Sequence, residues 1–131
     1  WEMYGEELVG MAWSSTTAMG PGPVLELRDA LQEGRFDDAR WLTERLRWAH
    51  EPFLVGQDFM EFAKYNVPLE KIRVNHAGYI NVGTCRPPYT EDLVPEEHVR
   101  TSIEHVDRYK QIQQEIEQRF GVRAGRQASK V

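Results

Sequence analysis

The chain has 131 residues, the size of a single domain. Its 16 basic and 21 acidic residues give a net charge of −5, which argues against a general nucleic-acid-binding protein, because phosphate contacts need a basic surface. No apolar run approaches the roughly 20 residues of a membrane span, so no membrane partner is expected. The single cysteine, Cys85, excludes an internal disulfide and a cysteine-rich metal site, and it fits a reducing cytoplasm.

The first fifteen residues contain the one good strand candidate. Glu7–Ser15, ELVGMAWSS, is short and apolar throughout, as in a strand buried on both faces of a sheet. A lone buried strand leaves its backbone groups unpaired, so this stretch is expected to be the last strand of something larger. The sequence starts at Trp1 without an initiator methionine or a signal-peptide pattern, which suggests a fragment, a processed chain or part of a longer chain.

Helical patterns follow along most of the remaining sequence. Pro23 suits the first turn of a helix and Gly34 suits its end. Asp37 can cap the next helix, and Asp58 with Glu61 forms a D-x-x-E start, a relative of the capping box. The fold expected for the chain as given is therefore mostly α, with one strand followed by about five helices over residues 23–34, 37–52, 58–66, 68–78 and 95–121.

An extended connector separates the last two of these helices. Residues 81–89, NVGTCRPPY, contain two prolines that exclude a helix. The final helix then carries an apolar stripe at helical spacing, formed by Val99, Ile103, Val106, Ile112, Ile116 and Phe120. The basic residues after it are expected to form a solvated, frayed terminus.

Histidines are candidate metal ligands, and lysines are candidate nucleophiles. His98 and His105 are seven residues apart and share a helix face, but a zinc site needs three or four converging ligands, so exposed helix histidines are the favoured interpretation. A Schiff-base lysine is usually desolvated in a pocket. Lys64, Lys71 and Lys110 fall instead among charged or polar positions, so none of them is expected to be a nucleophile.

Two places are candidate binding sites, each with a structural alternative. Trp13, Ser14 and Ser15 stand where the predicted strand meets its loop, and on a parallel barrel this end of a strand faces the active site. The tryptophan either stacks on a conjugated ligand or packs between helix and strand. Asn66 either hydrogen-bonds a ligand or caps the helix expected from Pro68.

Three stretches taken together resemble one family. They are AWSSTTAMGPGPVLELRDAL, DFMEFAKYNVPLEKIRVNHAGY and CRPPY followed by LVPEEHV, and their W-S-S…G-P, F-x-K-Y-N-x-x-L-E-K and C-R-P-P-Y elements occur in that order. They resemble the C-terminal part of the dihydrodipicolinate synthase / N-acetylneuraminate lyase superfamily. Within it, they are most similar to the subgroup typified by trans-o-hydroxybenzylidenepyruvate hydratase-aldolase. The resemblance covers the chain from about Leu8 to about Phe120.

The resemblance implies an α/β fold, a (β/α)8 TIM barrel followed by a helical extension. In that fold Leu8–Ser15 would be the eighth strand, and residues 1–34 the last βα unit of the barrel. Residues 35–121 would be the C-terminal helical extension, and residues 122–131 a flexible tail. Family precedent also implies a homotetramer.

The resemblance also implies a chemistry. Family members form a Schiff base between a barrel lysine and the keto group of a pyruvate unit, and the imine serves as an electron sink for the adjacent carbon–carbon bond. In the subgroup, water adds to a conjugated aryl-substituted pyruvate, and retro-aldol cleavage then releases pyruvate and an aromatic aldehyde. The lysine and its partner tyrosine lie on earlier strands that this sequence lacks, so the isolated chain is expected to be inactive. No cofactor or metal is implied.

Only matching positions can receive roles from this resemblance. Trp13 would stack on the aryl end of the substrate, and Asn66 would hydrogen-bond the substrate or the reacting water. Ser14, Ser15 and Thr16 are loop candidates at the end of the strand. Two alternatives stay open: a non-catalytic helical domain for interaction or oligomerisation, and another pyruvate lyase or dehydratase with the same barrel.

Overall fold

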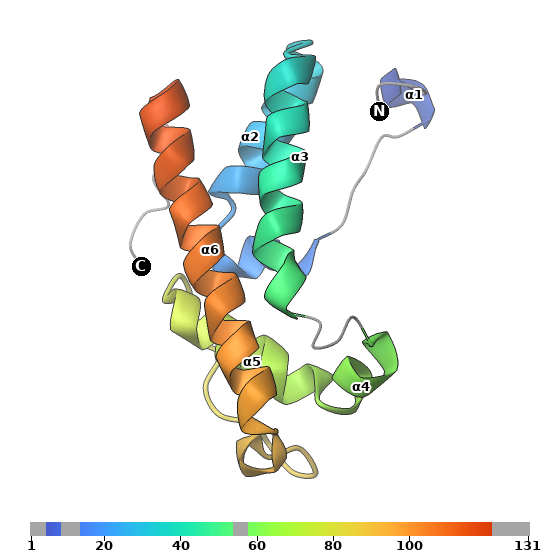
Figure 1. Cartoon of the computed structure of the whole chain (residues 1–131), viewed down its shortest axis with the longest axis vertical. Coiled ribbons are helices and arrows are strands. Elements are labelled where there is room, and N and C mark those ends of the chain that lie inside the picture. Colours follow the sequence, from blue (N-terminus) through green and yellow to red (C-terminus); the bar gives the residue numbers. More distant parts are fainter. Residues whose placement is uncertain (1–4, 9–13, 54–57, 122–131) are drawn as a thin grey trace.

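The computed structural model describes residues 5–8, 14–53 and 58–121, and the regular elements in these ranges are helices. Three long helices, α2 (Gly22–Gln32), α3 (Phe36–His50) and α6 (Glu96–Phe120), pack on one another. The N-terminal half of α6 continues past α3 and packs against α5 (Asn66–Ala77), and α4 (Phe59–Lys64) lies beside α5 at the lower right (Figure 1). Within the described ranges, no helix is long and apolar enough to cross a membrane.

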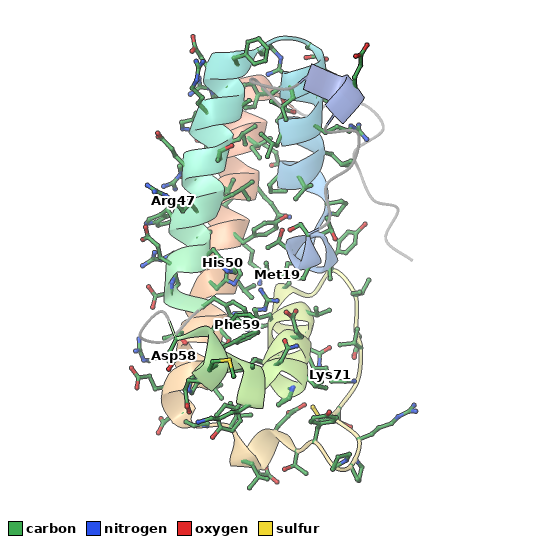
Figure 2. The ribbon with its side chains drawn as sticks, turned by 90° about the vertical axis from the view of Figure 1, so that its right-hand side faces the viewer. Met19, Arg47, His50, Asp58, Phe59 and Lys71 are labelled. Atoms are coloured by element: carbon green, nitrogen blue, oxygen red, sulfur yellow. The ribbon has the colours of Figure 1, made fainter. Side chains whose placement is uncertain are left out.

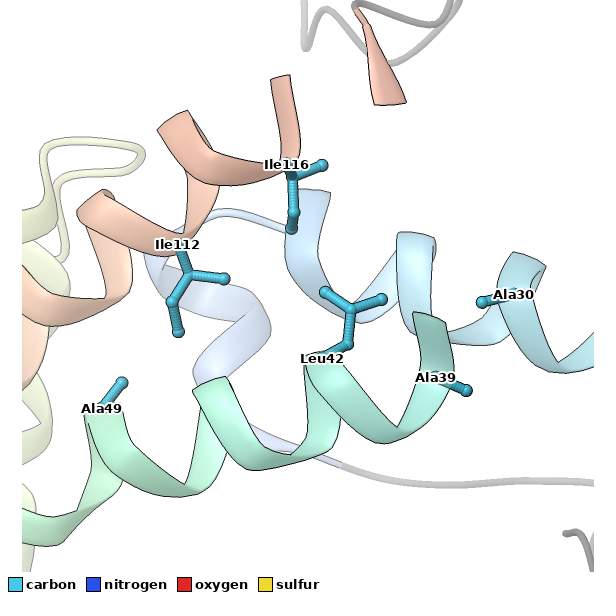
Figure 3. Close-up of a cluster of buried hydrophobic side chains, with 6 residues drawn as sticks. All are labelled: Ala30, Ala39, Leu42, Ala49, Ile112 and Ile116. Carbon is cyan, nitrogen blue, oxygen red and sulfur yellow. The ribbon is translucent and has the colours of Figure 1, made fainter. Parts of the chain in front are cut away.

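The three long helices meet in one apolar cluster. Leu42 of α3 and Ile112 of α6 have no exposed surface, and both point into the space between their helices (Figure 3). Alanines at the contacts let the helix backbones approach closely. The cluster consists of Ala30, Ala39, Leu42, Ala49, Ile112 and Ile116. The apolar stripe predicted for the last helix therefore supplies two of its residues.

A polar network closes the far end of this bundle. Glu26 of α2 is fully buried, and its Oε1 accepts a hydrogen bond of 2.8 Å from Nη2 of Arg35. Arg35 also donates to Asp38, which in turn accepts from Arg119 at the end of α6, each at 2.9 Å. The hydrogen bond from Arg35 holds the pKa of Asp38 below its usual range. These contacts fix the turn between α2 and α3 against the last turn of α6.

Several helix boundaries follow the sequence signals. Pro23 lies in the first turn of α2, and Asp58 caps α4 by accepting from the N–H groups of Met60 and Glu61. Gly78 ends α5 at φ 75°, a left-handed conformation that glycine adopts without a steric cost. The last helix is confirmed between Pro95 and Gly121.

Two predicted helix starts are wrong. α3 begins at Phe36, with Arg35 before it and no side-chain cap, so Asp37 lies inside the first turn as a charge favourable to the helix dipole. α5 begins at Asn66 rather than at Pro68. A proline fits any of the first positions of a helix, because the N–H that it lacks has no partner there in any case.

The strand predicted over Glu7–Ser15 is wrong where the structure describes it. Gly5–Leu8 form the short helix α1, and Ser15 begins the 3₁₀ helix η1 (Ser15–Met19). The rest of that stretch, residues 9–13, lies outside the described residues. No residue in the described ranges is in a strand, so none of them offers the neighbouring strand that a β-ladder requires. The barrel implied by the resemblance involves strands beyond this sequence and stays a prediction.

Candidate functional site

The turn at Ser14 and Ser15 is held by its own hydroxyl groups. Ser14 precedes η1, and its Oγ accepts from the N–H of Thr16 at 3.3 Å and lies 2.7 Å from Thr16 Oγ1. Thr17 Oγ1 donates to the Ser14 carbonyl at 2.8 Å. Serine and threonine side chains favour such turns because they satisfy nearby backbone groups. Trp13, the residue before this turn, lies outside the described residues.

The other end of η1 is fixed by a buried tyrosine. Tyr109 of α6 has no exposed surface, and its hydroxyl donates to the Gly20 carbonyl at 2.7 Å. Gly20 has a φ of 132°, and a Cβ added to it would lie 2.3 Å from Nε2 of Gln113. Burial raises the pKa of Tyr109, so this hydroxyl is a stable donor rather than a phenolate.

Asn66 lies at an elbow between two helices. α4 ends at Lys64 and α5 begins at Asn66, so the break falls at Tyr65. Pro68 explains it, because in a continuous helix its ring would clash with the carbonyl of Lys64, four residues earlier. Asn66 is exposed in the first turn of α5, and no side chain caps this helix. The capping alternative for Asn66 is therefore wrong, and its amide is available for other contacts.

Arg73 lies further along α5 and links that helix to the Ser15 turn. Only 1% of Arg73 is exposed, and its Nη2 is 3.5 Å from Ser15 Oγ. The same nitrogen pairs with the Glu70 carboxylate. The guanidinium carbon lies 3.8 Å from the ring centre of Phe53, and Nη1 lies 3.2 Å from Nδ1 of His105. Burial lowers the pKa of Arg73, and the adjacent charge of Glu70 opposes this shift.

The expectation of exposed histidines is wrong for the last helix. His98 is 5% exposed and His105 is 1% exposed, because both lie on the inner face of α6 among its apolar positions. The ring centres of His105 and His50 are 5.0 Å apart. Figure 2 shows His50 at the lower end of α3, close to the level of Met19 and above Phe59 of α4. Burial, and then the charge of Arg73, lowers the pKa of both rings, that of His105 to about 2.

Neither metal ligation nor a buried lysine is found in the described part of the chain. No group of three or more histidine, cysteine or acidic side chains there could hold a metal ion. Lys71 Nζ donates to the carbonyls of Val82 and Thr84 at 2.7 and 2.9 Å, and Lys110 Nζ donates to the carbonyl of His76 at 2.9 Å. Lys64 pairs with Glu61 at the surface. These ammonium groups are not desolvated in a pocket.

An open hollow at Val67, the residue that follows Asn66, has no counterpart in the sequence predictions. Its volume is about 690 Å³, and it lies between α5 and the connector around residues 82–89. The side chain of Asn75 holds the connector in place through Val82 and Gly83. The hollow is lined by Val67, Lys71, Val82, Gly83, Thr84, Arg86, Pro87 and Tyr89.

Ser14, Ser15 and Asn66 lie on two elements that pack on each other. Ser14 and Ser15 begin η1, which packs against α5. Asn66 stands at the start of the same α5, two turns before Arg73. Arg73 is the residue that sequence reasoning missed, because no short motif marks an arginine that contacts several elements at once.

The chain is similar in sequence to known proteins. No protein-family model matches the chain. It is 43% identical over 81 residues to trans-2'-carboxybenzalpyruvate hydratase-aldolase of Nocardioides sp. (strain KP7), an alignment that covers 62% of this chain and 24% of that protein. It is 37% identical over 97 residues to trans-O-hydroxybenzylidenepyruvate hydratase-aldolase of Pseudomonas putida, covering 71% of this chain and 29% of that protein.

A solved structure is also similar to this chain. The structure of PhdJ bound to a substrate intermediate matches with a TM-score of 0.79 and 37% sequence identity, over 87% of this chain and 34% of that chain. The chain therefore spans less than a third of the length of the curated relatives described above. It is related to the trans-o-hydroxybenzylidenepyruvate hydratase-aldolases and matches the C-terminal portion of these proteins.

Proposed function

We propose that this chain is the C-terminal part of a class I, Schiff-base hydratase-aldolase. Its substrate would be an aryl-substituted pyruvate, and its products pyruvate and an aromatic aldehyde. The observation that carries this proposal is the identity of 37–43% to two enzymes that are named as hydratase-aldolases of such compounds. In this proposal, residues 1–34 form the last unit of a barrel and residues 35–121 form its helical extension. The whole protein would be a homotetramer in the cytoplasm.

The residues of this chain would bind and orient the substrate rather than form the imine. The Schiff-base lysine would come from a segment outside this sequence. Asn66 is exposed at the start of α5, and its carboxamide has both donor and acceptor atoms. It can hydrogen-bond a substrate oxygen while it accepts from the water that adds to the double bond. The Ser14 and Ser15 hydroxyls and the Trp13 indole would contact the remainder of the substrate.

The proposed reaction has two steps, and the binding residues must accommodate the intermediates of both. Water first adds across the double bond conjugated to the imine, which places a hydroxyl group beside the aryl ring. The hydroxyl then loses its proton, the carbon–carbon bond breaks, and its electron pair moves into the imine to give an enamine. Aromatic aldehyde leaves, and protonation and hydrolysis of the enamine release pyruvate. A neutral amide such as Asn66 can serve both steps without a change in charge.

A grafted enzyme tests this proposal. The chain replaces the matching C-terminal portion of the Pseudomonas putida relative, and release of aromatic aldehyde is followed spectroscopically. The graft is expected to be active, and Asn66→Ala is expected to lower kcat/KM about a hundredfold, the usual cost of losing a hydrogen bond to a reacting group. Gln118→Ala, which removes an exposed amide from α6, serves as the control and should leave the rate unchanged.

The isolated chain provides the complementary measurement. Incubated with an arylidene pyruvate and borohydride, it is expected to trap no pyruvate, because the nucleophilic lysine lies elsewhere. Pyruvate trapped on one of its own lysines would contradict the assignment of the nucleophile. A graft that folds, as judged by its circular dichroism spectrum and native mass, and yet releases no aldehyde would contradict the proposed function.

A further inference from the structure

Arg73 is buried where four elements of the chain meet. Its guanidinium contacts Ser15 of η1, Glu70 of α5 and His105 of α6. It also stacks on Phe53 in the short 3₁₀ helix η2 (Glu51–Phe53). We propose that Arg73 is a positioning residue of the substrate site, which holds the Ser14–Ser15 turn against the helix that carries Asn66. This inference rests on the proposed function, because it gives Arg73 a role in the same site.

The spacing along α5 connects the two parts of the site. Asn66, Glu70 and Arg73 follow one another at intervals of four and three residues, so they lie along one face of the helix. Exposure falls along this face, because Asn66 is exposed, the Glu70 side chain is 32% exposed and the Arg73 side chain is 1% exposed. The face therefore starts at the candidate substrate ligand Asn66 and ends, inside the molecule, at Ser15.

The contacts of Arg73 use the fixed geometry of a guanidinium group. Its nitrogens donate within one plane in set directions, whereas the face of that plane can stack on an aromatic ring. Nη2 is shared between Ser15 and Glu70, Nη1 faces His105, and the plane covers Phe53. A lysine has one nitrogen and cannot make this set of contacts, so the position distinguishes the two basic residues.

A packing role alone does not account for a charge at this place. Burying a charged group costs free energy, and an apolar residue of similar volume often gives equal or greater stability. What an apolar residue cannot do is donate to the Ser15 hydroxyl while it also binds Glu70 and His105. Tyr109 already holds the far end of η1 at Gly20, so Arg73 fixes the remaining end, the one that follows Ser14.

The first arm of the test uses the 131-residue chain and backbone amide resonances. Arg73→Lys keeps the charge and removes the planar group, and Ser15→Ala removes the receiving hydroxyl with little risk to folding. Arg73→Lys is expected to shift the amide resonances of Ser14–Thr17, and Ser15→Ala is expected to shift the amide resonance of Arg73, which lies 58 residues away in the sequence. The control is Arg45→Lys. Arg45 also joins two helices, with bonds of 2.8 and 2.7 Å to Glu115 and a stacked Trp48, but it does so away from η1.

The second arm measures kcat/KM in the grafted enzyme. Misplacement of substrate contacts by a fraction of an ångström has large kinetic effects, so Arg73→Lys and Ser15→Ala are each expected to lower kcat/KM about tenfold. Arg45→Lys should change it less than about twofold. Arg73→Lys combined with Asn66→Ala should lose less than the product of the single losses, because both act on one site. Arg45→Lys combined with Asn66→Ala should give the full product.

The outcomes separate this inference from the proposed function. Unchanged Ser14–Thr17 resonances in Arg73→Lys, together with an unchanged Arg73 resonance in Ser15→Ala, would overturn the link itself. Shifted resonances with an unchanged kcat/KM, or with fully multiplicative losses, would overturn the positioning role. A folded but inactive unsubstituted graft would refute the proposed function, and with it the catalytic meaning of Arg73, whereas the resonance shifts would still report the physical link.

Discussion

At the scale of single residues, the interior of this protein is notable for its buried cation and neighbouring histidines. His105 is 1% exposed, and Nη1 of Arg73 lies 3.2 Å from its Nδ1. Because that nitrogen faces a permanent donor, it is expected to be the acceptor of a neutral ring. His50 lies beside it, and Arg108 adds a further positive charge nearby. Protonation of His105 would therefore place like charges together in a dry environment.

This arrangement predicts how stability depends on pH. Burial and the neighbouring charges lower the pKa of His105 from 6.5 to about 2 in the folded chain. Between these values the unfolded chain binds the extra proton, so the stabilisation is complete above about pH 6.5 and is lost as the pH falls. His105→Gln should reduce the loss of unfolding free energy between pH 6.5 and 5.5 by up to about 1 kcal/mol, measured by urea unfolding. Equal slopes in the two proteins would contradict this.

At the scale of elements, the short helix α4 depends on its ends. It has 6 residues, too few for an isolated helix to be stable in water. Asp58 satisfies two of its N–H groups, from Met60 at 2.8 Å and Glu61 at 3.2 Å. Pro68 prevents its fusion with α5, and Phe62 anchors it to a second apolar cluster with Phe53, Leu69 and Val94. A local cap and one buried ring therefore determine whether the elbow beside Asn66 forms.

Removal of this cap should have a measurable cost. Asp58→Ala is expected to lower the free energy of unfolding by about 1 kcal/mol, because two amide groups lose their acceptor. Asp58→Asn keeps an acceptor in the same place and should cost only a few tenths of a kcal/mol. Urea unfolding gives both values, and amide exchange at Met60 and Glu61 locates the effect. An equal loss in both variants would show that charge, rather than capping, is responsible.

At the scale of the whole molecule, the bundle of α2, α3 and α6 supplies most of the apolar core. Its six-residue cluster has Leu42 near the centre, with no exposed surface. Other large apolar side chains lie at the surface, among them Tyr79, Ile80, Tyr89 and Leu93. The connector therefore keeps much of its apolar area exposed, even though Phe53, Phe62, Leu69 and Val94 form a second buried cluster at that end of the fold.

The contrast between these two ends gives a direct test of the core. Leu42→Ala should lower the free energy of unfolding by about 2–5 kcal/mol, because it removes buried methyl groups and leaves a cavity. Leu93→Ala makes the same chemical change at a side chain that is 71% exposed, and it should cost less than about 0.5 kcal/mol. Thermal and urea unfolding of the 131-residue chain measure both. A similar cost at the two positions would contradict the placement of the core.

The comparison of sequence with structure shows which features are local. Helix ends at Pro23, Asp58 and Gly78 could be predicted directly from the sequence, because the effects of these residues act within one turn. The burial of His98 and His105 could not be predicted from the sequence, because the part of the helix face that they occupy is polar and its packing partners were not known. The strand prediction failed where it could be checked, since a strand depends on neighbours that a short apolar run does not reveal.

The candidate site divides in the same way. Asn66, Ser14 and Ser15 are predicted site residues because they lie in ordered motifs, and their roles stay predictions. The structure places Ser14 and Asn66 at helix starts. Arg73 reaches Ser15, which is 58 residues away in the sequence, and no periodic pattern encodes a contact of that range. Trp13 lies outside the described part of the chain, so its role in substrate binding stays a prediction.

The contact between Gly20 and α6 has a consequence for how this sequence can vary. Gly20 combines a φ of 132°, a carbonyl that accepts from Tyr109, and a side of the backbone that Gln113 covers. Saturation mutagenesis should find that no other residue is tolerated at position 20. At position 109 it should accept only a side chain whose hydroxyl still reaches the Gly20 carbonyl. One hydrogen bond therefore links the constraints on positions 20 and 109, even though 89 residues separate them along the chain.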